Sequence, residues 1–341
     1  MSDFFRNFFR NFFSTRDDYD LVRLVDRRHF DGSIHGEISK PAFDIICDID
    51  KTYLETEFDT VVDLARTAME DSRAKVTVFG AREVLLAARW AHGSPPNGLH
   101  FVSSSPPQLR RVLQAKLAMD GLDWTSDTFK NQAYNLRKRR LSLLRHHVAY
   151  KTLAILSIME DRGPGGRFVM IGDNAESDPL VYGGVARLLE GRVSVDDFQQ
   201  HLVNAGSQDF ETAQIMPLAR KVHGTGTVAA IFIRMVPGTS GHKPFTTEPG
   251  VWPPMSGFKS FFEVANGMVE SGVLPPDADV IFKLAVAIHN SALVPVPTLV
   301  GQLRQRAEES SSLEVAGAFR GAAIRLEDHL PAPWLIRAPL S

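Results

Sequence analysis

The feature that most constrains the fold of this chain is an alternation of short apolar runs with segments of helical periodicity. The apolar runs predict strands at residues 43–50, 99–105, 167–173 and 228–236. Helical patterns lie at residues 58–71, 80–90, 106–122, 149–161 and 178–191. Parallel strands need crossover connections, and helices usually supply them. The sequence therefore predicts an α/β fold, a parallel sheet with helices on both faces.

Polar residues stand where three of these predicted strands end. Asp48 and Asp50 close the first strand, Ser103–Ser105 follow the second, and Asp173 ends the third. Open parallel sheets bind their ligands at the carboxyl ends of the strands. We expect these side chains to meet at one edge of the sheet and to form the functional site.

Charge and cysteine content exclude some classes of protein. The formal net charge is −2, which argues against a protein that coats nucleic acid through its overall field. The single cysteine, Cys47, excludes an internal disulfide and predicts a reducing, cytoplasmic location with Cys47 as a buried apolar residue. No apolar stretch approaches the roughly 20 residues that span a bilayer.

The chain divides into three segments by composition. Residues 1–40 form an N-terminal segment, residues 41–236 carry the predicted sheet, and residues 237–341 begin with a Gly/Pro-rich loop or linker. Helical patterns follow that loop at residues 258–274, 279–290, 298–309 and 313–330. We expect a helical C-terminal extension.

A phenylalanine tract marks the N-terminal segment. Phe4–Phe13 repeats Phe-Phe-Arg-Asn at a spacing of four residues, so a helix would carry rings on one half and polar groups on the other. Such an apolar face needs a partner. Two alternatives are open: docking onto this protein or a second subunit, and peripheral contact with a membrane.

Four sequence elements follow one another along the chain. They are "DIDKT" at residues 48–52, Ser103, Lys151 within "YKTLAI", and "GDNAESD" at residues 172–178. With them, the chain resembles the haloacid dehalogenase superfamily of phosphotransferases. It is most similar to the catalytic domain of actin-patch-associated phosphatidate phosphatase and its bacterial relatives, over residues from Phe43 to about Val236. The resemblance implies a Rossmann-like phosphatase core with a small cap.

The resemblance also implies roles for individual residues. Asp48 would attack phosphorus and form an aspartyl-phosphate. Asp50 would protonate the leaving oxygen and then activate water. Thr52 and Ser103 would bind the transferring group or hold the loop. Lys151 would place a fixed cation on the phosphoryl oxygens.

A magnesium site follows from the same resemblance. Asp173, Asp48, the backbone carbonyl of Asp50, and Asp178 would supply the oxygen ligands that Mg²⁺ prefers. Asn174 and Glu176 have no assigned role. A second interpretation of residues 172–178 is an Asx-rich turn that caps the following helix.

The substrate is suggested by a basic stretch at residues 136–147. It includes Arg137 and Arg140, which together with Ser104 are the candidate substrate-binding residues. One interpretation is a solvated helix face, and the other is a collar that attracts an anionic headgroup. The small cap implies an open site and a bulky substrate. With the phenylalanine tract, these features favour a lipid phosphate such as phosphatidate.

Other functions stay open at this point. The phosphate could belong to a nucleotide or to the end of a nucleic acid. The chain could also be a non-catalytic binding or scaffold protein on the same fold. Lys51 departs from many superfamily members, and its side chain could face solvent or a substrate headgroup. The oligomeric state is open as well.

Overall fold

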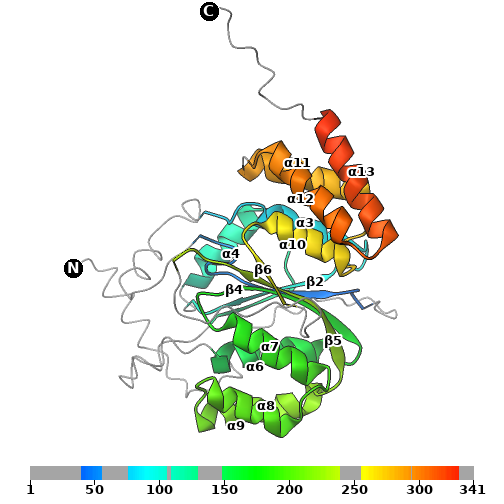
Figure 1. The fold of residues 1–341 in the computed structure, drawn as a ribbon. Helices are drawn as coiled ribbons and strands as arrows, with labels where there is room; N and C mark the ends of the chain where they lie inside the picture. Colours follow the sequence, from blue (N-terminus) through cyan, green and yellow to red (C-terminus); the bar gives the residue numbers. More distant parts are fainter. Residues whose placement is uncertain are drawn as a thin grey trace, which may run out of the picture. The chain divides into compact units, whose positions relative to one another are not determined.

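The computed structural model describes residues 40–55, 76–105, 109–129, 148–238, 255–292 and 294–329. A six-stranded sheet lies at its centre, in the order β3-β2-β1-β4-β5-β6 (Figure 1). The strands are β1 (Asp44–Asp48), β2 (Gly98–Ser103), β3 (Ser126–Phe129), β4 (Gly166–Asp173), β5 (Gly226–Arg234) and β6 (Met255–Phe258). The pairings of β1 with β2 and β4, of β2 with β3, and of β4 with β5 are parallel. The predicted α/β fold with a parallel sheet is confirmed.

Strand β1 is the central element. All five of its residues are buried, as expected for a strand covered on both faces. Cys47 is a buried free thiol within it, in keeping with an apolar role. Because β1 lies between β2 and β4, the ends of three different chain segments meet beside Asp48. This arrangement positions the site.

Two strands were not predicted. Strand β3 has only four residues, three of them with polar side chains, so it carries no clear apolar pattern. Strand β6 lies in the stretch that the sequence indicated as a Gly/Pro-rich loop, and that interpretation was wrong for residues 255–257. Its two central residues are exposed, which is typical of an edge strand and removes the alternation that marks a strand in sequence.

Helices cover both faces of the sheet (Figure 1). Helix α4 (Arg110–Met119) lies on one face, and helices α6 (Val148–Arg162) and α7 (Asp178–Leu189) lie on the other. Helices α8 (Val195–Asn204) and α9 (Asp209–Val222) form an outer layer beyond α6 and α7.

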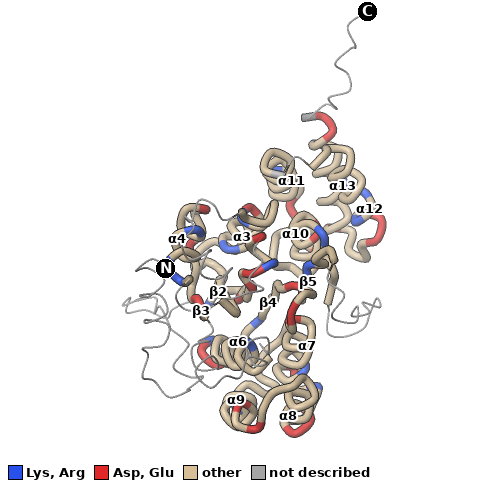
Figure 2. Tube along the Cα trace, turned by 90° about the vertical axis from the view of Figure 1, so that its left-hand side faces the viewer, with Lys and Arg blue, Asp and Glu red and all other residues tan. Residues whose placement is uncertain are grey.

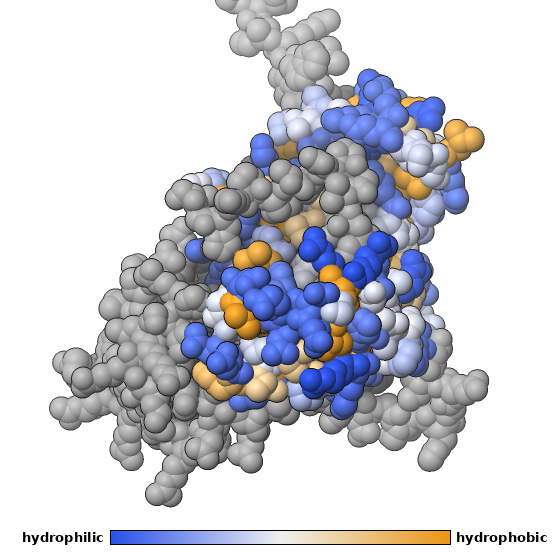
Figure 3. Space-filling model, turned by 60° about the horizontal axis from the view of Figure 1, so that its bottom comes forward, coloured by the Kyte–Doolittle hydropathy of each residue, from blue (hydrophilic) through white to orange (hydrophobic). Residues whose placement is uncertain are grey.

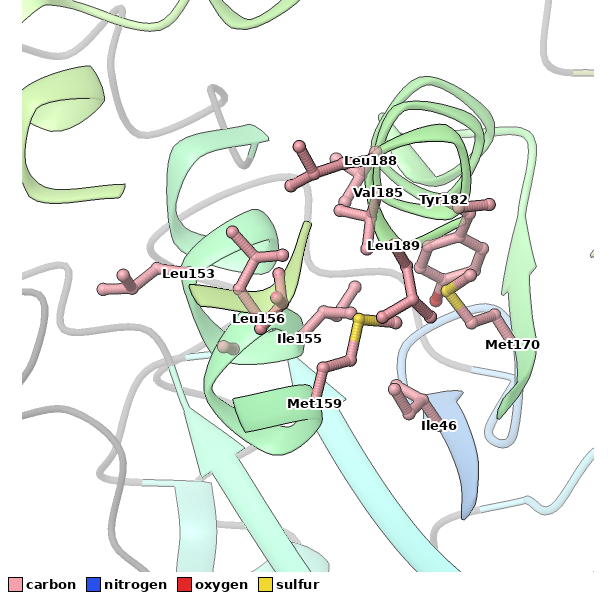
Figure 4. Packing of buried hydrophobic residues seen from close by; sticks show 14 of the residues in the cluster. Ile46, Leu153, Ile155, Leu156, Met159, Met170, Tyr182, Val185, Leu188 and Leu189 are labelled. Atoms are coloured by element: carbon pink, nitrogen blue, oxygen red, sulfur yellow. The ribbon is translucent and has the colours of Figure 1, made fainter. Parts of the chain in front are cut away.

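The main core lies between the sheet, α6 and α7. Figure 4 shows Ile155 and Met159 of α6 beside Val185 and Leu189 of α7, with Ile46 of β1 on the sheet side. All five side chains are at most 1% exposed. Burial of a side chain of this size stabilises the fold by roughly 1.5–3 kcal/mol. The core thus fixes α6, and with it Lys151, against the central strand.

The outer helices present a mainly hydrophilic surface. The face that carries α8 and α9 shows scattered apolar residues among polar ones (Figure 3). Helix α8 begins with a capping box in which the Ser194 hydroxyl accepts from the N–H of Asp197 at 3.0 Å. Its buried residues are Phe198 and Leu202, four positions apart on one face.

A second compact unit consists of helices. The chain forms one unit from residues 1–77 and 98–257 and another from residues 78–97 and 258–341. The second unit contains α3 (Ala81–Trp90), α10 (Phe261–Glu270), α11 (Ala278–Ala292), α12 (Val296–Glu309) and α13 (Leu313–His329). The predicted helical C-terminal extension is present, and a segment between β1 and β2 joins it. The division of the chain at residues 40 and 236 stays a prediction.

Several sequence predictions fall outside the described residues. They concern the phenylalanine tract Phe4–Phe13, the helical pattern at residues 58–71 and the basic stretch with Arg137 and Arg140. Within the ranges that the structure describes, no helix is both long enough and apolar enough to cross a membrane.

Candidate active site

The site lies at the carboxyl ends of three neighbouring strands. Asp48 is the last residue of β1, Ser103 the last of β2 and Asp173 the last of β4. All three side chains are at most 1% exposed. The sequence placed these residues at one edge of a parallel sheet, and the strand order brings them together there.

A tight turn follows β1 and brings Asp50 back toward β2. The N–H groups of Tyr53 and Leu54 both donate to the carbonyl of Ile49, at 3.0 and 2.9 Å. Lys51 adopts a positive φ of 61°, in the left-handed region that non-glycine residues rarely occupy. The turn therefore has a strained backbone at one residue.

Two serines hold the Asp50 carboxyl group. The hydroxyl of Ser103 donates to Asp50 Oδ2 at 2.9 Å, and that of Ser105 donates to the same oxygen at 2.8 Å. The N–H of Ser105 in turn donates to Ser103 Oγ at 3.0 Å. Ser103 thus holds the Asp50 carboxyl group, and its predicted contact with the transferring group stays a prediction. Thr52 also holds a loop, because its hydroxyl donates to Asp173 Oδ2 at 3.4 Å.

Lys151 lies at the centre of an acidic cluster. Its Nζ is 3.0 Å from Asp48 Oδ1 and 3.1 Å from Glu176 Oε2, and it donates to Asp178 Oδ1. The side chain is 1% exposed. Burial disfavours its charge, but Asp178, Asp48 and Glu176 together raise the pKa of Lys151 well above its usual value. Lys151 is therefore a fixed cation beside Asp48.

The loop between β4 and α7 is an Asx-type turn. Asp173 Oδ1 accepts from the N–H groups of Ala175 and Glu176, at 2.6 and 3.2 Å. Asp178 Oδ2 accepts from the N–H of Asp173 at 3.2 Å. A Cβ at Gly172 would lie 2.3 Å from Asp178 Oδ2, so this close approach requires glycine. A turn is thus present, but Ser177, the N-cap residue of α7, forms no side-chain cap hydrogen bond, and metal ligation by this loop stays a prediction.

The carboxylates of this cluster could hold a metal ion. Asp48, Asp173 and Asp178 each offer an oxygen, and these atoms lie within 4.8 Å of one another. Acidic positions gather where β4 leads into α7 (Figure 2). Neither carboxylate oxygen of Asp48 accepts a hydrogen bond within the described part of the chain. Oδ1 lies 3.0 Å from the ammonium group of Lys151, and a bound cation would satisfy the acceptor capacity that remains on these two buried oxygens.

The electrostatics of the cluster agree with a cation site. Burial raises the pKa of Asp48 well above its usual value, and the neighbouring Asp178, Asp173 and Glu176 raise it further, while Lys151 lowers it. Burial and then the charge of Asp178 raise the pKa of Asp173 to about 7. Burial raises the pKa of Asp178 too. Four carboxylates thus face one ammonium group, and a divalent cation fits this excess of negative charge.

Asp50 and Ser104 were predicted as site residues but are not among the three candidate metal ligands. The Asp50 carboxyl group lies with the serines, outside the group of three candidate ligands, so a contribution from its backbone carbonyl stays a prediction. Ser104, predicted to bind substrate, donates from its hydroxyl to Glu176 Oε2 at 3.2 Å and thereby reaches the neighbourhood of Lys151. The roles of Arg137 and Arg140 stay predictions.

Three site residues were not assigned from the sequence. Ser105 stands in the serine run after β2, and its alternation with Ser103 along the chain was a usable signal. Glu176 belongs to the acidic loop but carried no assigned role. Arg234 ends β5, and its guanidinium donates to the carbonyl of Lys51 at 2.7 Å. The predicted strand ran to residue 236, so the sequence did not mark Arg234 as its end.

Comparison with known proteins gives a match over the part of the chain that carries this site. Residues 43–195 match the family model described as "Phosphatidate phosphatase APP1, catalytic domain". The match begins at Phe43, where the sequence resemblance begins, and includes Asp48, Ser103, Lys151 and Asp178. It ends before β5 and the C-terminal helices. No curated protein and no solved structure matches the chain significantly.

Proposed function

We propose that this chain, whose residues 43–195 match the catalytic domain of the phosphatidate phosphatase APP1 family, hydrolyses phosphate monoesters through a covalent aspartyl-phosphate. The observation that carries the proposal is the separation of the two motif carboxyl groups. Asp48 lies beside Lys151 and the acidic cluster, whereas Asp50 is held by two serine hydroxyls. The mechanism needs one acid to attack and another to transfer a proton.

Asp48 has the surroundings of a nucleophile. Its oxygens accept no hydrogen bond from the described residues, and the ammonium group of Lys151 lies 3.0 Å from Oδ1. With Lys151 beside it, the ionised carboxylate would be placed to attack phosphorus. One oxygen of Asp48 would form the bond to phosphorus as the bond to the leaving oxygen breaks.

Asp50 has the surroundings of a positioned acid and base. Two hydroxyl groups donate to Oδ2, so its proton would be carried on Oδ1. That proton would pass to the leaving oxygen in the first step. The resulting carboxylate would then remove a proton from the water that attacks the aspartyl-phosphate, which returns Asp50 to its starting state.

Lys151 would bind the oxygens of the transferring group. Those oxygens are negative and repel an anionic nucleophile, so a fixed ammonium group beside Asp48 lowers the barrier to attack. Ser104 lies close enough to Glu176 to donate to the same region. Binding of a phosphoryl group would replace part of the contact between Lys151 and Glu176.

Mg²⁺ is the cofactor that the donor set favours. Asp48, Asp173 and Asp178 would hold it through carboxylate oxygens, the ligands that this small, hard cation prefers. When bound, the ion would neutralise charge on the phosphoryl oxygens. Its charge would also lower the pKa of the Asp48 carboxyl group, which burial raises.

The proposed substrate is a lipid phosphate such as phosphatidate. The support is the description of the matching family together with the basic stretch that includes Arg137 and Arg140. Peripheral contact with a membrane through Phe4–Phe13 is part of this proposal. A cytoplasmic location is expected from the single cysteine.

A phosphate-release screen tests the proposed function. The full chain is incubated with phosphatidate in mixed micelles, with nucleotides, with sugar phosphates and with 5′-phosphorylated oligonucleotides, each with Mg²⁺ or with a chelator. We expect release from phosphatidate to exceed release from the other substrates and to require the cation.

Asp48→Asn is the matched control for this screen. It keeps the shape of the side chain but removes the nucleophilic charge, so release from every substrate should fall by several orders of magnitude. Release from nucleotides or oligonucleotides alone would contradict the lipid assignment. No Asp48-dependent release from any substrate would favour a binding or scaffold role.

A further inference from the structure

Arg234 connects two loops of the site. It ends β5, and the parallel register pairs it with Asp173. Its side chain is 11% exposed, and its Nη1 donates to the carbonyl of Lys51 at 2.7 Å. Nη2 forms an ion pair with Glu55 at 2.5 Å, and the carbonyl of Arg234 accepts from the N–H of Asn174 at 3.0 Å. One residue thus joins the turn after β1 to the loop after β4.

The contact with Lys51 supports a strained backbone. With a φ of 61°, Lys51 occupies the left-handed region, where a Cβ comes too close to the following carbonyl oxygen. Such conformations persist only where the surroundings hold them. A hydrogen bond from a guanidinium group is charge-assisted and strong. Its planar group also serves Lys51 and Glu55 with two different nitrogens, which a lysine could not do.

The strained turn determines where Asp50 lies. Asp50 precedes Lys51 directly, and its carboxyl group reaches Ser103 and Ser105 only because the chain reverses at this point. The same reversal is closed by the N–H groups of Tyr53 and Leu54 on the carbonyl of Ile49. A shift of about 1 Å in a catalytic group can cost a hundredfold in rate.

We propose that Arg234 is a positioning residue for Asp50: it holds the left-handed turn at Lys51 and thereby places the carboxyl group that transfers the proton. The catalytic part of this proposal rests on the proposed function of Asp50. The structural part, that Arg234 holds the turn, stands independently of it. The two parts need separate measurements.

Amide hydrogen exchange tests the structural part without any substrate. In Arg234→Met, we expect the amides of Tyr53 and Leu54 to exchange about ten- to hundredfold faster than in the wild type, the range expected when a hydrogen bond from a charged group is lost. Lys51→Gly in the same chain should restore slow exchange, because glycine adopts a positive φ without cost. Arg192→Met is the matched control, since Arg192 is an exposed arginine paired with Glu190.

Hydrolysis of one aryl phosphate and one alkyl phosphate tests the catalytic part of the proposal. An alkoxide needs the proton of Asp50 to leave, whereas an aryl oxide departs with little help. Arg234→Met should therefore lower kcat for the alkyl ester roughly tenfold more than for the aryl ester, with KM little changed. Lys51→Gly should bring the ratio of the two kcat values back toward that of the wild type.

Each outcome decides one part of the proposal. Unchanged exchange at Tyr53 and Leu54 in Arg234→Met, or a Lys51→Gly change that restores nothing, would overturn the role of Arg234. Faster amide exchange together with equal decreases in kcat for both esters would support the role of Arg234 in holding the turn. It would contradict the proposed effect of Arg234 on Asp50. A wild type without phosphatase activity would refute the proposed function, while the exchange result would still stand.

A conservative variant covers the case in which Arg234→Met does not fold. Arg234→Lys keeps the charge but offers one nitrogen in place of the two that bind Lys51 and Glu55. It should give intermediate exchange rates and an intermediate kcat ratio. Values equal to those of the wild type would overturn the proposal.

Discussion

Replacing Lys151 by methionine should make the protein depend on a cation for its stability. Lys151 is 1% exposed and contacts three carboxylates, those of Asp48, Glu176 and Asp178. Methionine fills a similar volume but leaves these carboxylates without their ammonium partner. The variant should therefore fold less stably unless protons or a divalent cation supply the missing positive charge.

The magnitude follows from burial. Removing one partner of a buried ion pair costs about 3–5 kcal/mol, because the remaining charge is left in a poorly solvated place. Asp48 and Asp178 are almost completely buried, while Glu176 is 22% exposed and contributes less. For a unit of this size, 1 kcal/mol shifts the melting temperature by about 2–4 °C, so the expected decrease is about 6–20 °C.

The raised pKa values also determine the direction in which the stability of Lys151→Met changes with pH. Burial and the other acids already raise the pKa values of Asp48 and Asp178, and loss of Lys151 raises them further. The native state then binds more protons than the unfolded state above the ordinary pKa of an aspartate. Stability should fall as the pH rises through the raised pKa values. The decrease in melting temperature should therefore be larger at about pH 8 than at about pH 5.

Thermal unfolding of wild type and variant, with Mg²⁺ or with a chelator, measures this effect. Lys221→Met is the matched control, because Lys221 is 62% exposed and its ion pair with Glu160 should contribute at most about 1 kcal/mol. Mg²⁺ should raise the melting temperature of Lys151→Met more than that of the wild type. Equal melting temperatures for the two lysine variants, or a loss that neither acid nor Mg²⁺ reduces, would refute the reasoning.

Three further predictions concern the cation, the proton and the membrane. Because burial raises the pKa of Asp173 to about 7, Mg²⁺ affinity measured by calorimetry should increase as the pH rises through this value; a constant affinity would contradict it. Asp50→Asn should lower kcat for alkyl phosphates far more than for aryl phosphates; equal losses would make Asp50 structural. Deletion of residues 1–14 should abolish sedimentation with anionic liposomes and leave hydrolysis of a soluble aryl phosphate unchanged; an insoluble product would assign the tract to this protein's own core.

The position of the site could be predicted because the signals for it are local. Asp48, Ser103 and Asp173 each follow a continuous apolar run, and the alternation with helices makes the strands parallel. Parallel strands bring their carboxyl ends to one edge whatever the strand order is. Lys151 stands near the start of α6, which packs on one face of the sheet, and its role could be expected from the family resemblance.

The contacts inside the site could not be predicted because they join distant segments. The serine hydroxyls donate to Asp50 because β2 lies next to β1 and the turn at Lys51 reverses the chain. The link from Arg234 to Lys51 spans 183 positions and depends on the place of β5 in the sheet. No local sequence pattern predicts either of these contacts.

The second unit illustrates the same limit. Helix α3 shows clear helical periodicity, and its existence was predicted. Its membership in a unit with α10–α13 follows from packing between segments far apart in the chain. Strand β6, half exposed at the sheet edge, carried too few apolar residues to be recognised.

The central claim is that Asp48 becomes phosphorylated during turnover, and a trapping measurement tests it most directly. Wild type and Asp50→Asn are mixed with a labelled aryl phosphate and Mg²⁺, quenched with acid, digested and examined by mass spectrometry. The account predicts phosphate on the peptide that contains Asp48, in larger amount in Asp50→Asn because no base activates water, and none in Asp48→Asn. Turnover by the wild type with no phosphate on Asp48 in either protein, or undiminished turnover by Asp48→Asn, would contradict it.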